Sequence, residues 1–252
     1  MEDQLYHEFF ELEDRHWWFV ARRRILRDII GRDLQLSPGS SILDVGCGTG
    51  AFLADCSSEF RTTGTDTSPL AVEYCRKRGL HNVVQCTLDS YPHPEERFDL
   101  ITLLDVIEHV DDDLGLLRNA LALLRPSGRL LVTVPAYQFL WSRHDEVNHH
   151  KRRYTASRLS SVLQRAGFTV QRTTYLNTFL FPLAAVERIA DRLRSGRDTA
   201  VLSMPPAFLN KTLLSIFASE RHLLRFVSYP FGLSVMAIAT VRNGNDSSPS
   251  DH

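Results

Sequence analysis

The chain has 252 residues, of which 43% are hydrophobic and 23% charged, with 29 Lys and Arg against 30 Asp and Glu. This length and composition predict a globular protein built around one large α/β domain. The balanced charge gives no case for nucleic-acid binding, so we expect no DNA partner, and it argues against RNA as a partner.

The cysteines and the start of the chain predict a cytoplasmic protein. The four cysteines form no C-x-x-C pair, which is typical of reduced thiols in the cytosol. The first residues are acidic and polar without an apolar leader, so we expect no signal peptide. The longest apolar run, residues 179–186, is too short to cross a bilayer.

Residues 1–36 are predicted to form a helical lid, with helix over 2–34, because apolar side chains recur there at helical spacing. We interpret the aromatic run His16-Trp17-Trp18-Phe19 as a staple that packs this segment on the core; the alternative is an aromatic wall over a bound ligand. Four arginines are expected to form a solvated face: Arg22, Arg23, Arg24 and Arg27.

Residues 41–50 combine a short apolar strand, an acidic residue and three glycines before a new helix. Glycine lets a ligand approach the bare backbone, and the start of the helix points free N–H groups at that ligand. The loop also fits a loose G-x-G-x-x-A dinucleotide pattern, but Asp44 would repel a pyrophosphate. Asp44 suits a ligand with an ammonium and a sulfonium group, such as S-adenosylmethionine (SAM). A glycine turn without a ligand is the alternative.

This segment resembles the glycine-rich loop of class I SAM-dependent methyltransferases, which implies SAM as the cofactor. The loop residues expected to contact it are Asp44, Gly46, Cys47, Gly48 and Gly50.

From residue 41 onward, strands alternate with helices. Strands are expected near 41–45, 61–66, 82–86, 98–104 and 128–134, and helices near 50–59, 68–78 and 111–124. This alternation predicts a parallel sheet with helices on both faces and ligands at the carboxyl ends of the strands.

The resemblance covers about residues 40–177 and the last strand, and implies a Rossmann-like methyltransferase domain over 37–242. It implies a seven-stranded, mostly parallel sheet of order 3-2-1-4-5-7-6, whose sixth and seventh strands are expected near 168–177 and 234–241. The gap between them, 178–232, is interpreted as a helical cap over the substrate mouth, with contact to a membrane surface or a dimer partner as alternatives. Residues 243–252 are expected to be disordered. The sequence does not predict the oligomeric state.

Further cofactor contacts follow from the strand ends. Asp66 ends the second strand, where a carboxylate can accept both ribose hydroxyls. The resemblance places adenine contacts after the third strand and contacts to the methionine part of SAM after the fourth. The residues assigned in this way, beside Asp66, are Thr67, Thr87, Leu88, Leu104 and Asp105.

The spacing Asp105-x-x-Glu108-His109 is similar to the E-x-x-E-H metal motif of ubiquinone-pathway O-methyltransferases and small-RNA 2′-O-methyltransferases. Two carboxylates and an imidazole can hold a hard divalent cation. An Asp in place of the first Glu is a departure from that motif. In metal-free relatives the Glu caps a turn or the His packs under the cofactor, and that alternative stays open.

The polar stretch 141–154 follows a strand end, where active-site loops lie. It is similar to a loop of many bacterial small-molecule methyltransferases that ends in a histidine before R-R-Y. His144 and His150 are candidate bases for an acceptor hydroxyl, and Arg153 a candidate anion contact. The candidate set also includes Asp145 and Tyr154. The alternative is a solvated loop that Arg152 and Tyr154 tie to the fold.

These features predict a SAM-dependent methyltransferase that acts by in-line displacement on a small, amphiphilic acceptor, at a hydroxyl group. Two other hypotheses stay open: an RNA methyltransferase with a D-x-x-E-H metal site, and a SAM-binding protein without catalytic activity. A site close to a membrane surface is compatible with the segment 178–232.

Overall fold

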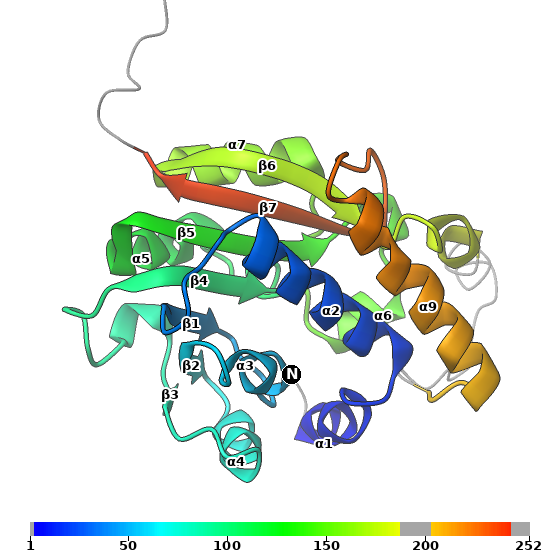
Figure 1. Ribbon diagram of the computed structural model, residues 1–252, viewed down its shortest axis with the longest axis horizontal. Coiled ribbons are helices and arrows are strands. Elements are labelled where there is room, and N and C mark those ends of the chain that lie inside the picture. Colours follow the sequence, from blue (N-terminus) through cyan, green and yellow to red (C-terminus); the bar gives the residue numbers. More distant parts are fainter. Residues whose placement is uncertain (1–2, 187–202, 243–252) are drawn as a thin grey trace, which may run out of the picture.

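The computed structural model describes residues 3–186 and 203–242. They form a seven-stranded sheet of order β3-β2-β1-β4-β5-β7-β6 (Figure 1), which confirms the predicted order. The strands are β1 (Ser41–Val45), β2 (Arg61–Asp66), β3 (Val83–Gln85), β4 (Phe98–Leu104), β5 (Leu124–Pro135), β6 (Phe168–Leu176) and β7 (Ser234–Val241). Only β7 runs against its neighbours, because β1 to β5 pair in parallel and β7 pairs antiparallel with β5 and β6.

The register of the parallel strands gathers their carboxyl ends at one edge of the sheet. Val45 of β1 lies opposite Thr65 of β2 on one side and Leu103 of β4 on the other. Strands buried on both faces read as continuous apolar runs, and β4 accordingly has Leu100, Ile101 and Leu103 without exposed surface. The polar residues that follow β1, β2 and β4 therefore lie together.

The helices begin and end where the local sequence predicts. Ser68 caps α4 by accepting the Leu70 N–H, with Pro69 in the first turn, and Gly167 ends α7 with a φ of 104°. The helices between strands are α3 (Ala51–Cys56), α4 (Pro69–Lys77), α5 (Asp113–Leu123) and α7 (Ala156–Ala166). Shorter elements are α6 (Arg143–Val147) and two 3-10 turns, Leu88–Ser90 and Gln138–Leu140.

The N-terminal segment differs from the single predicted helix. It forms two helices, α1 (Asp3–Leu12) and α2 (Trp17–Arg32), because His16 adopts an extended conformation and its ring accepts the Trp18 N–H. Helix α1 packs against α4 through Tyr6 and Tyr74. Helix α2 buries Ile25 and Ile29 and crosses in front of the sheet (Figure 1). Repetition of apolar residues continues through the break, so periodicity alone does not show it.

Within the segment 178–232, helix α9 (Ala207–Leu223) lies beside α2 (Figure 1). Asn210 accepts the Trp17 N–H at 2.9 Å, and the rings of Trp17 and Phe217 are in contact. The described part of the segment is thus attached to the N-terminal helices. Residues 187–202 of the predicted helical cap and the tail 243–252 lie outside the described residues. Within residues 3–186 and 203–242, no helix is both long and apolar enough to cross a membrane.

Candidate functional site

The glycine loop after β1 adopts a conformation that glycine favours. Gly46 and Gly50 have φ angles of 70° and 83°. A Cβ atom would lie 2.7 Å from a Val106 methyl at Gly46, and equally close to the Cys75 sulfur at Gly50. Both positions therefore require glycine for backbone conformation and for space. The loop leaves its backbone open to a cavity on the side of the strand ends.

Asp44 is a buried carboxylate at the base of this loop. Thr102 donates a hydrogen bond to it at 2.6 Å. Burial is the main cause that raises the pKa of Asp44 to about 7, while the Thr102 bond and the charge of Arg22 act in the opposite direction. A cationic group bound beside Asp44 would favour the ionised form of this carboxylate, so the position suits a positively charged ligand.

Asp66 lies at the end of β2, beside the loop. It accepts the N–H groups of Gly48 and Ser68, both at 2.9 Å, and the Tyr6 hydroxyl lies 3.4 Å away. Burial raises the pKa of Asp66 against these hydrogen bonds. A residue from α1 thus reaches the position where the sequence predicts a ribose contact.

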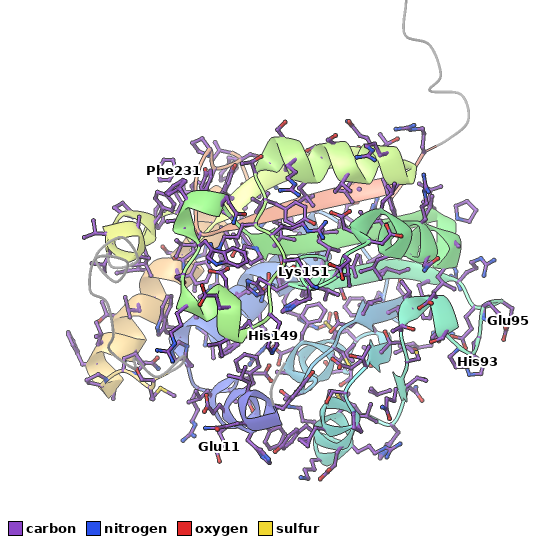
Figure 2. All side chains as sticks on the ribbon, turned by 180° about the vertical axis from the view of Figure 1, so that it is seen from behind. Glu11, His93, Glu95, His149, Lys151 and Phe231 are labelled. Atoms are coloured by element: carbon purple, nitrogen blue, oxygen red, sulfur yellow. The ribbon has the colours of Figure 1, made fainter. Side chains whose placement is uncertain are left out.

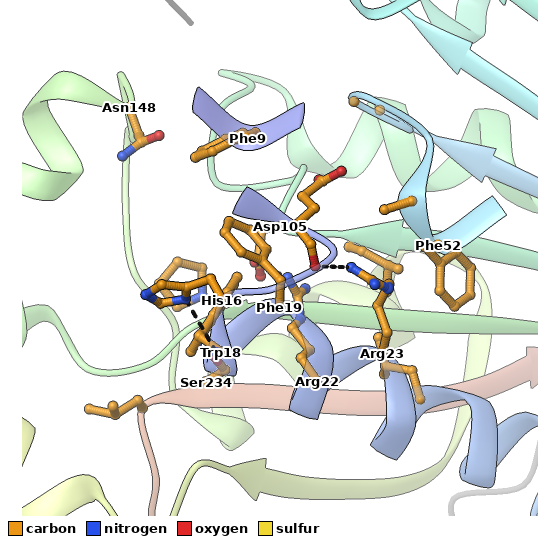
Figure 3. Close-up of a pocket in the computed structure, with 18 of the residues that line it drawn as sticks. Phe9, His16, Trp18, Phe19, Arg22, Arg23, Phe52, Asp105, Asn148 and Ser234 are labelled. Atoms are coloured by element: carbon orange, nitrogen blue, oxygen red, sulfur yellow. Dashed lines mark hydrogen bonds and ion pairs between the residues drawn. The ribbon is translucent and has the colours of Figure 1, made fainter. Parts of the chain in front are cut away.

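One cavity of about 580 Å³ joins these groups to the polar loop after β5. Asp44, Gly46 and Asp66 line one part of it, and His109, His150 and Arg153 line another. Figure 3 shows residues that line it: Phe9, Trp18 and Arg22 come from α1 and α2, and Asp105 comes from the end of β4. Pockets of about 300–1000 Å³ hold ligands of cofactor or drug size.

The N-terminal helices supply a large share of the cavity wall. Trp17, Trp18 and Phe19 all line it, so the aromatic run is a wall of the cavity as well as a packing element. Trp17 and Trp18 also pack against the main core. Trp17 and Trp18 therefore pack the N-terminal segment on the core and also form part of the cavity wall.

The prediction of a solvated face for the arginines is wrong for Arg22 and Arg23. Their side chains are only 12% and 13% exposed, and both line the cavity. Arg22 forms an ion pair with Asp105 at 2.7 Å, donates to Thr133 and lies over the Trp18 ring. The sequence did not predict that Arg22 lines the cavity, because its partners Asp105 and Thr133 are distant in sequence.

The other predicted cofactor residues divide into two groups. Cys47, Gly48, Leu104 and Asp105 line the cavity. Thr67 is exposed at the start of the turn before α4. Leu88 is buried in the main core, and Thr87 shares a hydrogen bond with Ser90. The cavity thus gathers most loop candidates and the methionine-side candidates, while Gly50, Thr67 and the predicted adenine contacts lie outside its lining.

Asp145 organises the polar loop. Arg153 contacts both of its carboxylate oxygens, at 2.7 and 2.9 Å, and the His150 ring nitrogen Nδ1 lies 2.8 Å from Oδ1. These bonds hold the pKa of Asp145 well below its usual range, although burial acts in the opposite direction. An ionised Asp145 accepts a hydrogen bond from the Nδ1–H of His150, which fixes the orientation of this cavity-lining ring.

Two other candidates in this loop have different outcomes. The predicted substrate contact at Tyr154 is wrong: its side chain has no exposed surface, and its hydroxyl donates to Asp113 at 2.7 Å. Tyr154 therefore connects the loop to α5, as the structural alternative proposed. His144 belongs to α6, and its side chain lies outside the described residues.

Three potential metal ligands lie together, and they differ from the linear motif. Single ligand atoms of Glu108, His109 and His150 lie within 4.8 Å of one another. Asp105 is outside this cluster because it pairs with Arg22, so the expected grouping of Asp105 with Glu108 and His109 is wrong. Burial is the largest cause that lowers the pKa of His109 to about 4, followed by the charge of His150. His109 is therefore neutral at pH 7.

An apolar rim adjoins the cavity. Ala184 lines the cavity, and the same helical stretch exposes Leu183 and Val186, whose exposed fractions are 64% and 67%. Phe181 packs between the rings of Tyr137 and Phe231. Large exposed apolar side chains beside a polar cavity are typical of a binding site for a ligand with an apolar part.

Residues 18–173 match a family model described as a methyltransferase domain. A Mycolicibacterium smegmatis protein named as a SAM-dependent methyltransferase is 29% identical over 171 residues, which are 64% of this chain and 63% of that protein. The chain thus covers less than two thirds of that relative. The ubiquinone biosynthesis O-methyltransferase of Xanthomonas campestris is 32% identical over 104 residues, 38% of this chain and 43% of the relative.

The solved structures agree on the fold. The structure of a SAM-dependent methyltransferase from Archaeoglobus fulgidus superimposes with a TM-score of 0.53 at 19% identity, covering 86% of this chain and 94% of that one.

Proposed function

Because this chain belongs to the class I SAM-dependent methyltransferase family, we propose that it transfers the methyl group of SAM to a hydroxyl of a small, amphiphilic acceptor. The observation that carries the proposal is the single cavity. It joins the glycine loop and its acidic residues, which suit SAM, to an imidazole, Arg153 and an apolar rim, which suit an acceptor.

The residues on the cofactor side match the chemistry of SAM. Asp44 is assigned to the ammonium group and Asp66 to the ribose hydroxyls, because each is a cavity-lining carboxylate. Arg22 is assigned to the methionine carboxylate, since its guanidinium faces the same part of the cavity beside Asp105. When bound, SAM supplies an electrophilic methyl carbon on a sulfonium sulfur.

The acceptor side is assigned to the opposite part of the cavity. Asp145 and Arg153 fix the ring of His150, and we assign to His150 the activation of the acceptor hydroxyl. Trp17 and Trp18 supply an aromatic wall and the rim beside Ala184 receives an apolar tail. The name of the Xanthomonas relative, which states O-methylation in ubiquinone biosynthesis, supports an acceptor of this type.

We assign much of the rate of methyl transfer to the positioning of the two reactants. The acceptor oxygen must lie in line with the bond between methyl carbon and sulfur, and fixing two reactants in this way removes a large part of the barrier. The hydrogen bonds of Asp145 and the buried side chain of Arg153 hold the acceptor side rigid. Asp44 and Asp66 hold the other reactant.

The test is transfer of a labelled methyl group to chemically matched acceptors. The full chain is incubated with methyl-labelled SAM and either an alkylated phenol or catechol or the corresponding alkylated aniline. We expect label in the hydroxylated compounds and a loss of about 100-fold in turnover for His150→Ala, with SAM affinity unchanged. The matched control is His149→Asn, because His149 is the exposed neighbour and has a φ of 56° that Asn tolerates. Transfer only to the aniline, or no transfer to either, contradicts the proposal.

A further inference from the structure

Asn177 is a buried carboxamide without a hydrogen-bond partner in the part of the chain that the structure describes. The residue is only 1% exposed, and neither its Oδ1 nor its Nδ2 is bonded to another described group. In water an amide makes hydrogen bonds through both atoms, so burying it without them is unfavourable. Buried polar side chains are nearly always paired, and Asn177 therefore requires a structural reason or a ligand.

The position of Asn177 places it on the acceptor side of the cavity. Asn177 follows β6 and lines the cavity, as do Ser234 of β7 and Pro135 of β5. Leu176 at the end of β6 lies opposite Ser234, which in turn lies opposite Pro135. In the order of the sheet these strand ends are separated by β4 from β1 and β2, which carry the acids assigned to SAM.

The turn that carries Asn177 is held by bonds to two later segments of the chain. Glu220 of α9 accepts the N–H groups of Asn177 and Phe179, both at 2.8 Å. The Thr178 hydroxyl donates to the carbonyl of Phe231 at 2.6 Å, at the end of the molecule where Figure 2 labels Phe231. The amide is thus attached to a backbone that is fixed before any ligand binds.

The backbone conformation alone does not explain the side chain. Asn177 has a φ of 59°, a left-handed value that asparagine tolerates better than most residues. Glycine adopts this φ more readily still, and it would not bury an amide without partners. A comparison of asparagine with glycine at this position therefore separates a conformational role from a binding role.

The neighbouring charges favour an uncharged partner for the amide. Arg153 contacts both carboxylate oxygens of Asp145 and donates to the carbonyl of Ala136 at 2.8 Å, so its positive charge is compensated. A carboxylate on the acceptor would bring only hydrogen-bond acceptors and would leave Oδ1 of Asn177 unmatched. A group with a donor beside an acceptor pairs with both atoms of the amide.

We propose that Asn177 is a specificity-determining residue that binds a second polar group of the acceptor, an uncharged group with a hydrogen-bond donor and acceptor side by side. The inference rests on the proposed function and extends it to the chemistry of the substrate. A carboxamide and a pair of vicinal hydroxyls both offer this pattern. Since Asn177 has almost no surface in contact with water, pairing requires a small rotation of the amide into the cavity that it lines.

The experiment measures binding without turnover. The full chain is titrated calorimetrically with alkylated phenols, with and without S-adenosylhomocysteine, the product form of the cofactor. The ring carries in turn a carboxamide, a vicinal pair of hydroxyls, a carboxylate or an ethyl group. We expect the carboxamide, the vicinal hydroxyls or both to bind roughly tenfold or more tightly than the other two, because two hydrogen bonds are gained. The compound that does so identifies the source of the pattern.

Asn177→Gly tests whether the amide causes this preference. The variant keeps the φ and removes the amide, so the preference should disappear while the affinity for the ethyl compound stays nearly unchanged. Asn177→Asp, which also tolerates the φ, replaces the donor by an acceptor and should lose the preference as well at pH 8. Thermal unfolding shows that both variants fold.

The matched control is Asn82→Gly. Asn82 is exposed and precedes β3, at the opposite edge of the sheet from β6, so this variant should keep the full preference. No preference in the wild type, or the same preference in Asn177→Gly, overturns the inference and identifies Asn177 as a residue required only for the turn.

Failure of this inference is distinguishable from failure of the proposed function, because the titrations need no methyl transfer. A preference that depends on Asn177, with no transfer to any hydroxyl, supports the binding role and contradicts the proposed reaction. Transfer to every phenol with the same kcat/KM overturns the inference and leaves the reaction intact. If both hold, Asn177→Gly should raise the KM of the preferred acceptor roughly tenfold or more and change kcat much less.

Discussion

At the scale of single residues, the titration of Asp44 makes a prediction about cofactor binding. Its pKa is about 7, and an ammonium ligand binds the ionised form. The apparent affinity is reduced by the fraction that is protonated, so SAM should bind roughly tenfold more weakly at pH 6 than at pH 8. Calorimetric titration at several pH values measures this slope.

Asp44→Asn tests whether Asp44 causes the pH dependence of SAM affinity. It should bind SAM more weakly at pH 8 and lose most of the pH dependence, whereas Glu95→Gln, an exposed acid with 75% of its side chain accessible, should behave as wild type. An unchanged slope in Asp44→Asn would show that another group, with Asp66 the first candidate because burial raises its pKa too, controls the affinity.

The same substitution should stabilise the ligand-free protein. The pKa of Asp44 is raised from 3.8 in the unfolded chain to about 7, so its contribution to stability is present below pH 4 and is lost as the pH rises through 7. Asn removes this penalty. We expect the free energy of unfolding of Asp44→Asn to exceed that of wild type by about 1–3 kcal/mol at pH 8, and by less at pH 5. Urea unfolding at both pH values measures the difference, and a variant that is less stable at pH 8 contradicts it.

Tyr154 should affect stability and not recognition. Tyr154→Phe removes the hydrogen bond to Asp113 and should lower the free energy of unfolding by about 1 kcal/mol, because the half-buried Asp113 loses one of its two donors and keeps only Arg152. The KM for the acceptor should stay unchanged. A several-fold rise in that KM with unchanged stability would restore Tyr154 to the substrate site.

Sequence predicted the residues of the glycine loop because their requirement is local. Gly46 must be glycine for its own φ and for the space beside it. Arg22 and Tyr154 were misassigned because their roles depend on contacts 83 and 41 residues away, with Asp105 and Asp113. A polar residue in a loop looks the same in sequence whether it faces a ligand or the core.

At the scale of elements, the attachment of α9 depends on one buried acid. Glu220 accepts the N–H groups of Asn177 and Phe179, both at 2.8 Å. Glu220→Ala removes the acceptor of both donors, and an unsatisfied buried group costs about 1–3 kcal/mol. We therefore expect a loss of about 2–4 kcal/mol in the free energy of unfolding, measured in urea.

The control is Glu73→Ala, which removes an exposed helical acid that pairs with Lys77 and should leave the free energy of unfolding nearly unchanged, because exposed ion pairs contribute little. If Glu220→Ala is equally mild, the two donors bind water and the helix is held by its contacts with the N-terminal helices, which include the Asn210 hydrogen bond.

Elements with strong local signals were predicted within a few residues. Ser68 and Pro69 mark the start of α4, and Gly167 marks the end of α7. The break between α1 and α2 was not predicted, because His16 caps a helix in the middle of an apolar pattern that continues on both sides. A histidine cap has no distinctive sequence signal.

At the scale of the whole molecule, the alternation of strands and helices was sufficient to predict the parallel part of the sheet and the edge of the sheet at which the cavity lies. The walls of the cavity come from α1, α2 and the ends of the segment after β6. The sequence predicted a lid and a cap in these segments, but it did not predict which of their side chains line the cavity. The sequence spacing predicted the proximity of Glu108 and His109 but not that of His150, which lies in a loop 41 residues after His109.

The central claim is that this cavity binds SAM through the acids at the ends of β1 and β2. Isothermal titration of the full chain with SAM and, separately, with NAD tests it most directly. We predict micromolar affinity for SAM, about −8 kcal/mol, a loss of at least tenfold in Asp66→Ala, and no heat from NAD. Binding of NAD without binding of SAM would contradict the assignment of Asp44 and the proposed function with it.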